Sequence, residues 1–542
     1  MIHGCARLDL HFRNATDSVL LDGRDLSVSR VTNAQDVEVS FSVTPQQFVP
    51  FGQKIQIKFA AVQSADSECS VTVHYSTSTN ASALQWLNAE QTADKKQPFL
   101  YSQCQAIHAR SLLPCMDAPA VKFTYSAEVT APSSLVVLMS AVAQGTRAID
   151  AGAQTISTFE QKVPISSYLL AIVAGHLVSL PLSERSAVWA EPSIVEKAAY
   201  DFAETEQMLR AGEALLGAYV WGRYDLLVLP PSFPYGGMEN PCLTFVTPTL
   251  LTGDRSLADV VAHEAAHSWT GNLVTNATWQ DFWLNEGNTM FVERKILAKL
   301  SSESERHFHA YIGYEGALHS AVFEQFNPSH PFTRLVPAFD SEAIDPDDAF
   351  STIPYEKGHT LLMFLEQKLG GPEKFDPFLR AYIDKFKFGT VTTCEWRSLL
   401  LEYFGADALK DIDWNAWLYT PGMPPAKPNF DMTLAEACDR LCSEWLNATE
   451  QQMATMNADA FHKLTAMQKI HFAGQLIKAA PLAHQKLATL DRLYKLSDSK
   501  NSEILFNWII LCVKSHWEPI FDVAIRMLTS QGRMKYCRPI YR

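Results

Sequence analysis

The chain has 542 residues, of which 47% are hydrophobic and 19% are charged, and its formal net charge at pH 7 is −14. A chain of this length and composition can fold into three or four ordinary globular domains. The acidic balance and the lack of any basic block argue against nucleic acid as the main partner.

The N-terminus and the cysteines indicate a cytoplasmic protein. The first seven residues lack the apolar segment of a secretory signal, and no apolar run has the length of a membrane span. The ten cysteines are scattered without a Cys-x-x-Cys pair, which is typical of reduced thiols. We therefore expect no membrane association and, because no coiled-coil pattern is present, a monomer.

The first third of the chain has the pattern of β-strands. Apolar and polar residues alternate with a period of two over residues 37–43, 54–59 and 122–129. This alternation predicts an N-terminal antiparallel β-sheet domain over residues 1–176. The pattern then changes to a mixture of helices and short strands, which predicts a second, catalytic domain over residues 177–418.

The last quarter of the chain is predicted to be helical. Four prolines fall within residues 419–430, which indicates a semi-rigid linker. Leu, Ala and Ile then recur with helical spacing through residues 431–542, as in a solenoid-like stack of helix pairs. The predicted fold class is therefore multidomain α+β, with a β-sheet domain first and an α-helical domain last.

The most informative motif is His-Glu-Ala-Ala-His at residues 263–267, followed after eighteen residues by Glu286. His263 and His267 are four residues apart on one helical face, so both imidazoles can reach one ion. Two histidines and a glutamate leave the fourth position of a zinc ion open, as in catalytic sites. Glu264 lies beside the ligands, where it can take a proton from a water on the metal. We therefore predict one Zn²⁺ with Glu264 as general base.

Some readings near this motif stay open. A bare His-Glu-x-x-His can be two solvated or core histidines, and it is the spaced Glu286 that favours zinc. Glu293 shares the helical face of Glu286, so it is either an acceptor for the N–H of a ligand histidine or an ordinary surface glutamate. Residues 256–259, Ser-Leu-Ala-Asp, predict a capping box at the start of the first helix.

Residues 234–241 read Pro-Tyr-Gly-Gly-Met-Glu-Asn-Pro. This segment resembles the Gly-x-Met-Glu-Asn signature of the gluzincin-class zinc aminopeptidases, and longer segments resemble the leukotriene-A(4) hydrolase family within that class. Those longer segments are residues 101–108, 230–253, 279–294, 354–358, 413–419 and 531–535. The resemblance covers nearly the whole chain. It implies a β domain, a thermolysin-like zinc catalytic domain, a proline-rich linker and a C-terminal helical domain.

The resemblance assigns one group of residues to the amino end of a peptide. Glu239 matches a glutamate that holds the free α-amine by charge-assisted hydrogen bonds, and Gln105 matches its polar partner. Tyr355 matches the tyrosine that stabilises the oxyanion of the tetrahedral intermediate. The neighbours of Glu239 in the signature are also expected to bind substrate: Tyr235, Gly236, Gly237 and Met238. From the residues alone, the two glycines could be a tight turn and Tyr355 a core tyrosine.

A second group is assigned to the far end of the substrate. Arg533 and Lys535 match cations that bind a free carboxylate, either of a peptide C-terminus or of a fatty acid, and arginine offers a planar fork for this contact. The alternative is a solvated basic turn. A carboxylate clamp at a fixed distance from the zinc favours short peptides with a free N-terminus and a free C-terminus.

The family's second activity opens the lipid epoxide leukotriene A(4) to the dihydroxy acid leukotriene B(4). Asp347 matches the carboxylate that directs water to the far end of the polyene. Phe350 stands where the mammalian-type enzyme has a tyrosine, a departure that bears on the lipid and not on the peptidase chemistry. The resemblance therefore predicts an aminopeptidase that is also an epoxide hydrolase. The alternatives are an aminopeptidase that has lost the lipid activity and a truncated, non-catalytic scaffold.

Both ends of the chain depart from the family pattern. Residue 1 is expected to fall inside the family's β domain, and the chain is expected to stop soon after Lys535, before the family's helical domain ends. Missing terminal helices would expose apolar surface and loosen Arg533.

Overall fold

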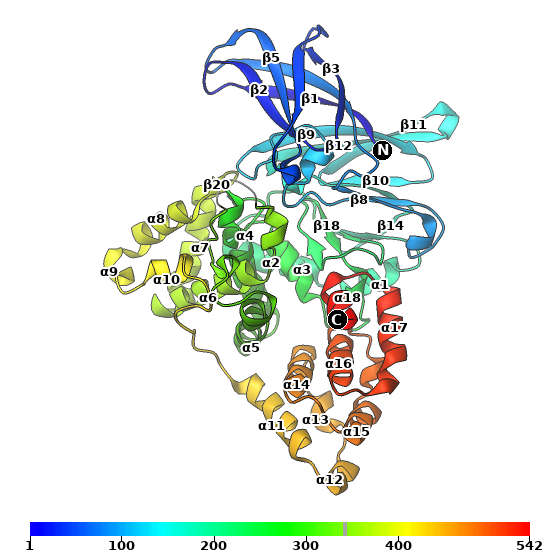
Figure 1. Ribbon diagram of the computed structural model, residues 1–542, viewed down its shortest axis with the longest axis vertical. Helices are drawn as coiled ribbons and strands as arrows, with labels where there is room; N and C mark the ends of the chain where they lie inside the picture. Colours follow the sequence, from blue (N-terminus) through cyan, green and yellow to red (C-terminus); the bar gives the residue numbers. More distant parts are fainter. Residues whose placement is uncertain (340–343) are drawn as a thin grey trace.

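The computed structural model describes residues 1–339 and 344–542. Three regions follow one another along the long axis of the molecule (Figure 1): β-sheets at the top, mixed strands and helices in the middle, and helices at the bottom. This is the multidomain α+β class that the sequence predicts. We keep residues 176, 418 and 430 as proposed domain limits.

The N-terminal region consists of antiparallel sheets with the strand orders β1-β6-β3, β2-β5-β4, β11-β12-β9 and β10-β13-β8-β7. The strands are β1 (His3–His11), β2 (Thr16–Gly23), β3 (Ser27–Asn33), β4 (Ser40–Pro45), β5 (Gln53–Gln63), β6 (Glu68–Ser76), β7 (Leu84–Leu87), β8 (Phe99–Ser102), β9 (Lys122–Pro132), β10 (Val136–Met139), β11 (Val142–Ile149), β12 (Gln154–Ser166) and β13 (Ile172–Gly175). Side chains of a strand alternate between its faces, so Ile55 and Ile57 are buried while Lys54 and Lys58 are exposed. The period-two pattern therefore predicted the buried face.

The central region contains a five-stranded sheet of order β14-β15-β16-β18-β17. Its strands are β14 (Val178–Pro181), β15 (Ala187–Ala190), β16 (Asp225–Val228), β17 (Gly237–Met238) and β18 (Leu243–Val246). The strands β15, β16 and β18 are parallel, and β17 is an antiparallel edge strand. This edge strand carries the glycine-rich signature.

Ten α-helices in the described part of the central region surround this sheet and the site. They are α1 (Val195–Asp201), α2 (Thr205–Leu216), α3 (Asp259–Ala266), α4 (Trp283–Leu300), α5 (Glu303–Ile312), α6 (Ile353–Lys368), α7 (Pro372–Phe386), α8 (Thr393–Phe404), α9 (Ala406–Leu409) and α10 (Trp414–Leu418). Helices α4 and α6 cross at two glycines, because a Cβ on Gly287 would lie 2.7 Å from the Cα of Gly358. This close approach brings Tyr355 of α6 beside Glu286 of α4.

The predicted capping box before α3 is wrong. The N-cap position belongs to Ala258, and no side chain caps the helix. Ser256 is instead held in a turn, where its N–H donates to Asp254 Oδ1 over 3.0 Å. Its hydroxyl accepts from Asn501 Nδ2 over 2.8 Å, so a contact with the C-terminal region takes the place of the cap.

The C-terminal region is helical, as predicted. Its helices are α11 (Thr433–Asn447), α12 (Glu450–Thr455), α13 (Asp459–His462), α14 (Ala466–Lys478), α15 (His484–Tyr494), α16 (Ser502–Lys514), α17 (Phe521–Ser530) and α18 (Met534–Tyr541). The chain returns to the central region at its end, where α18 lies beside that region (Figure 1). Backbone N–H groups of Gly532 and Met534 donate to the carbonyls of Pro231 and Pro234, over 2.7 and 3.1 Å. No helix in the described part of the chain is both long and apolar enough to cross a membrane.

Candidate active site

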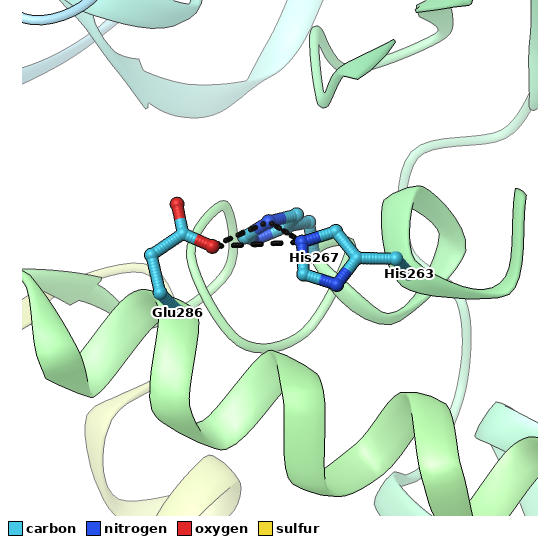
Figure 2. A group of neighbouring side chains, drawn as sticks. All are labelled: His263, His267 and Glu286. Carbon is cyan, nitrogen blue, oxygen red and sulfur yellow. Dashed lines mark hydrogen bonds and ion pairs between the residues drawn. The ribbon is translucent and has the colours of Figure 1, made fainter. Parts of the chain in front are cut away.

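The predicted metal ligands meet at one point. His263 lies on α3, His267 caps its C-terminal end, and Glu286 lies in the first turn of α4. Glu286 Oε2 is 3.5 Å from His263 Nε2 and 3.3 Å from His267 Nε2, and the two Nε2 atoms are 3.1 Å apart (Figure 2). The three ligand atoms therefore surround a space of the size that one ion fills.

The orientation of the imidazoles fits a cation at this point. His263 Nδ1 lies 2.8 Å from a carboxylate oxygen of Glu293, and His267 Nδ1 lies 2.9 Å from the carbonyl oxygen of Thr270. Both oxygens only accept hydrogen bonds, so each Nδ1 carries the proton and each Nε2 presents a lone pair. Glu286 Oε2 is buried and finds no hydrogen-bond donor in the described part of the chain. Three converging acceptors of this kind are the donor set of a zinc ion.

Glu264 lies against the glycine-rich strand. A Cβ on Gly237 would come within 2.2 Å of Glu264 Oε1, so only glycine leaves room for this carboxylate. Burial raises the pKa of Glu264 to about 8, while the imidazoles of His263 and His267 oppose that rise. A cation bound by the histidines would also favour the carboxylate form that a general base needs.

Glu239 is buried close to His267 and Glu264. Burial raises the pKa of its carboxyl, and the neighbouring His267 imidazole opposes that shift. Gln105 Nε2 from the N-terminal region approaches Glu239 Oε1 at 3.5 Å, and Asn272 Nδ2 donates to the Glu239 carbonyl over 2.7 Å. Carboxylate oxygens of Glu239 and Glu264 and a nitrogen of His267 lie within 4.8 Å of one another. A cationic amine placed here would meet two carboxylates.

Tyr355 stands over the ligands at the start of α6. Its ring stacks on that of His263, with 6.0 Å between centroids and 21° between planes. Burial raises the pKa of this phenol well above its ordinary value, and the Glu286, Glu239 and Glu264 carboxylates raise it further. The hydroxyl therefore stays protonated and can donate a hydrogen bond.

Arg533, from the C-terminal region, contacts Gly236, the residue just before β17. A Cβ on Gly236 would lie 2.8 Å from Arg533 Nη2, so this glycine leaves room for the guanidinium. Arg533 Nη1 donates to the hydroxyls of Thr249 and Tyr536, over 3.3 and 3.0 Å. Its buried Nε meets no acceptor among the described residues. Gly236 and Gly237 thus make room for Arg533 and Glu264 respectively.

Lys535 does not share the position of Arg533. Its side chain is 53% exposed, and its Nζ lies 2.5 Å from Glu503 Oε1. Lys535 therefore forms an ion pair with a carboxylate of the protein itself.

The remaining predicted binding residues lie around the glycine-rich strand. Tyr235 and Gln105 line a cavity of about 220 Å³ that also borders the N-terminal region. Phe350 is 47% exposed, and its ring lies edge-on to Tyr235 and Tyr355, at 6.4 and 6.2 Å. Met238 is buried, and its sulfur accepts from an amide of the N-terminal region over 3.0 Å. Its side chain therefore faces that region.

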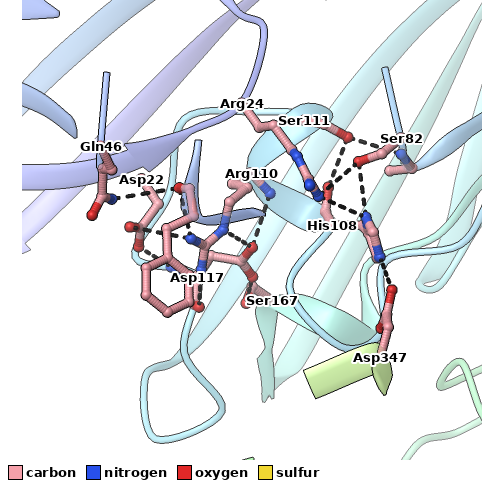
Figure 3. A network of polar contacts seen from close by, with 12 residues as sticks. Asp22, Arg24, Gln46, Ser82, His108, Arg110, Ser111, Asp117, Ser167 and Asp347 are labelled. Carbon is pink, nitrogen blue, oxygen red and sulfur yellow. Dashed lines mark hydrogen bonds and ion pairs between the residues drawn. The ribbon is translucent and has the colours of Figure 1, made fainter. Parts of the chain in front are cut away.

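Asp347 is held by the N-terminal region. His108 Nε2 lies 2.8 Å from Asp347 Oδ2, while its Nδ1 lies 2.8 Å from Ser82 Oγ and 3.3 Å from Arg24 Nη1 (Figure 3). A guanidinium only donates, so Nδ1 accepts and Nε2–H donates to the aspartate. Among the described residues, only Oδ2 of this carboxylate has a hydrogen-bond partner.

Sequence reasoning did not single out four residues that support the site. His108 stands inside a quoted signature, yet nothing in its spacing indicates that it contacts Asp347, 239 positions away. Thr249, Glu503 and Tyr536 carry no motif of their own. The only signal available for Tyr536 was its place next to Lys535.

Three family models match the chain. The Peptidase M1 N-terminal domain matches residues 1–169, the Peptidase family M1 domain matches residues 200–417, and the C-terminal domain of leukotriene A4 hydrolase matches residues 464–542.

Curated relatives match over nearly the whole chain. A protein of Xenopus laevis named leukotriene A-4 hydrolase is 47% identical over 529 residues, which are 97% of this chain and 86% of the relative. A protein of Emericella nidulans named leucine aminopeptidase 2 is 40% identical over 534 residues, 97% of this chain and 85% of the relative.

Solved structures agree with these relatives. The yeast LTA4 hydrolase in complex with bestatin superposes with a TM-score of 0.92 at 36% identity, over 99% of this chain and 87% of that one. An M1 zinc metallopeptidase of Deinococcus radiodurans has a TM-score of 0.63 at 22% identity, over 79% of this chain and 92% of that one, which shows a shared fold.

Proposed function

The chain belongs to the leukotriene A4 hydrolase / M1 aminopeptidase family and is an M1 zinc metallopeptidase, and from this premise we propose that it removes N-terminal residues from short peptides with a free C-terminal carboxylate. One observation carries the proposal. The adjacent residues Gly236 and Gly237 make room for Arg533 on one side and Glu264 on the other. A cation for the carboxylate and a base for the hydrolysis thus lie against two consecutive residues at the start of one short strand.

The peptide's amino end is proposed to bind at Glu239. A buried carboxylate with a raised pKa gains its charge when an ammonium group arrives, because each charge then stabilises the other. Gln105 lies beside the same carboxylate and is proposed to orient it. This contact restricts cleavage to the first residue of a chain.

The chemical step is proposed to use Glu264 and Tyr355. His263, His267 and Glu286 would hold the zinc ion, which when bound supplies a Lewis acid that acidifies water and polarises the scissile carbonyl. Glu264 takes the proton from the attacking water and passes it to the leaving amine. Tyr355 donates its phenolic hydrogen bond to the oxygen of that carbonyl as negative charge develops there.

Two treatments test the peptidase proposal. Removal of the metal by a chelator, or the substitution Glu264→Gln, is expected to abolish release of leucine from a short peptide such as Leu-Gly-Gly. The exposed Glu373 provides a matched control, and Glu373→Gln is expected to keep full activity. Cleavage that survives both chelation and Glu264→Gln would overturn the mechanism.

A second activity on a lipid epoxide is supported by Asp347. With Oδ2 bound to His108, its other oxygen, which has no partner among residues 1–339 and 344–542, is proposed to orient a water. The relatives named leukotriene A-4 hydrolase and LTA4 hydrolase make leukotriene A4 the epoxide to test, whereas the Emericella nidulans relative carries a peptidase name.

Analysis of the products formed from leukotriene A4 tests whether the protein has this epoxide hydrolase activity. The wild-type protein is expected to form one dihydroxy acid from the epoxide, and Asp347→Asn is expected to lose that product while it still cleaves Leu-Gly-Gly. If the wild type yields only the products of non-enzymatic hydrolysis, the chain is a peptidase without epoxide hydrolase activity.

A further inference from the structure

We propose that Lys122 of the N-terminal region is a positioning residue for Glu239, the carboxylate that would bind the α-amine, and that it acts through Asn272. This inference rests on the proposed peptidase function, because it concerns the residues that would hold the amino end of a peptide. Lys122 does not touch the substrate. Its ammonium fixes the loop that follows α3, and that loop fixes Glu239.

Lys122 joins the N-terminal sheets to the loop after the zinc helix. It is the first residue of β9, and its Nζ donates to the carbonyl oxygens of Asn272 and Leu273, over 2.9 and 3.1 Å. The backbone N–H of Asn272 donates to the carbonyl of His267, over 3.0 Å. The loop is therefore held by the end of α3 on one side and by the N-terminal region on the other.

The two carbonyl groups do not depend on Lys122 equally. The oxygen of Leu273 also accepts from the backbone N–H of Phe388, over 2.8 Å. The oxygen of Asn272 also meets the hydroxyl of Thr275, but at 3.4 Å, which is long for an O–H donor. Loss of the ammonium would therefore release Asn272 more than Leu273.

Asn272 carries this contact to Glu239. Its side chain is buried, and its Nδ2 donates to the carbonyl oxygen of Glu239 over 2.7 Å. Glu239 directly follows the edge strand β17 and is itself buried. Because its carbonyl and its side chain are carried by one backbone unit, a shift of Asn272 changes where the Glu239 carboxylate points. A charge-assisted hydrogen bond to an amine depends on that direction.

The charge of Lys122 is unfavourable for the folded state. Both of its partners are neutral carbonyl oxygens, and burial lowers the pKa of the ammonium to about 7. A lowered pKa means that folding disfavours the charged form. The loss of stability is complete below the folded pKa and disappears above the ordinary pKa of lysine. Removal of this charge should therefore not weaken the fold below pH 7.

The experiment measures inhibition of the zinc-loaded full-length protein by two matched ligands, L-leucine and isocaproate, which is leucine without its amine. Lys122→Met keeps a side chain of similar length and removes the donors. It is expected to raise the inhibition constant of leucine about tenfold, as loss of one orienting hydrogen bond would, and to leave that of isocaproate unchanged. KM for Leu-Gly-Gly should rise by a similar factor at unchanged kcat and zinc content.

Lys162 provides the matched control. It lies on β12, the strand that pairs with β9, and its side chain is 78% exposed. Lys162→Met is expected to leave both inhibition constants at their wild-type values.

A purely structural role for Lys122 makes different predictions. If the residue only fastened the N-terminal region to the central one, Lys122→Met would lower the melting temperature and weaken both ligands. The positioning role predicts a melting temperature at pH 6 that equals or exceeds that of the wild type, because an unfavourable charge is removed. A variant that does not fold, or that binds both ligands equally more weakly, would overturn the proposal.

A double variant tests the route through Asn272. Asn272→Ala removes the donor to Glu239, so adding Lys122→Met is expected to raise the inhibition constant of leucine by less than about twofold further. A further tenfold rise would show that Lys122 acts by another route, and the proposal would be wrong. If Asn272→Ala does not fold, the comparison of leucine with isocaproate in Lys122→Met still decides.

Failure of this inference can be told from failure of the proposed function. If the wild type and Glu239→Gln each bind leucine and isocaproate alike, recognition of the amine is itself wrong. If Glu239→Gln weakens leucine selectively while Lys122→Met does not, only the role of Lys122 is wrong.

Discussion

The two ends of the site are built in different ways. At the zinc end, His263, His267 and Glu286 come from two helices that follow one another in the chain. We call the other end, where Arg533 is proposed to bind a substrate carboxylate, the carboxylate end. There Arg533 donates a hydrogen bond to Thr249, which lies 284 positions earlier in the chain, and Glu503 lies nearby on α16. The zinc end is therefore a local unit, whereas the carboxylate end exists only when the C-terminal region packs on the central one.

The glycine-rich strand joins these two ends. Gly236 is packed by Arg533 and Gly237 by Glu264, so consecutive residues set the separation between the cation and the base. We expect substitutions at the zinc end to change the rate of chemistry. Substitutions at the carboxylate end should change which substrates bind.

The largest effect is expected from Glu286→Gln. Loss of the only carboxylate ligand should empty the zinc site and lower kcat/KM for Leu-Gly-Gly roughly 10³-fold or more, since both the Lewis acid and the acidified water are lost. Elemental analysis of zinc and the peptidase rate check this. Stoichiometric zinc with normal turnover would show that Glu286 is not a ligand.

Tyr355→Phe is expected to have the next largest effect. The substitution removes one donor to the developing oxyanion and keeps the ring, so kcat should fall about 10²-fold. KM and zinc content should stay near their wild-type values. A change in KM with kcat preserved would place Tyr355 in substrate binding instead.

Arg533→Met is expected to act on binding at the carboxylate end. Loss of a charge-assisted hydrogen bond should raise KM for Leu-Gly-Gly about tenfold to a hundredfold. The amide of the same peptide should be cleaved as by the wild type. Steady-state kinetics with both peptides measure the difference, and an equal loss for both would show that Arg533 supports the fold of the site.

The smallest effect is expected from Asn501→Ala. Asn501 caps α16, which carries Glu503, and its amide donates to Ser256 of the central region. Its loss should cost about 1 kcal/mol of unfolding free energy and raise KM for Leu-Gly-Gly by about two- to threefold. Thermal unfolding and kinetics measure the two effects.

Thr392→Ala provides the control for Asn501. Thr392 caps α8, a helix of the central region, through a capping box. Its loss should cost a similar free energy of unfolding and leave the KM values unchanged. If both variants change KM alike, loss of stability and not the contact between regions explains the effect of Asn501→Ala.

The sequence by itself determined the zinc end and the order of the three regions. Histidines four residues apart share a helical face whatever surrounds the helix, and the seven-residue spacing of Glu286 and Glu293 has the same basis. Both spacings hold in the structure, where Glu293 Oε2 lies 2.8 Å from His263 Nδ1. The family resemblance added Glu239 and Tyr355, which the structure brings to the same place as the ligands.

Only the tertiary structure decided which side chains Lys535, Asp347 and Ser256 contact. Lys535 pairs with Glu503, Asp347 with His108, and Ser256 with Asn501 in place of the predicted cap. Each of these contacts joins residues that are tens to hundreds of positions apart. Such contacts depend on how whole regions pack together, and periodicity or local spacing carries no information about that packing.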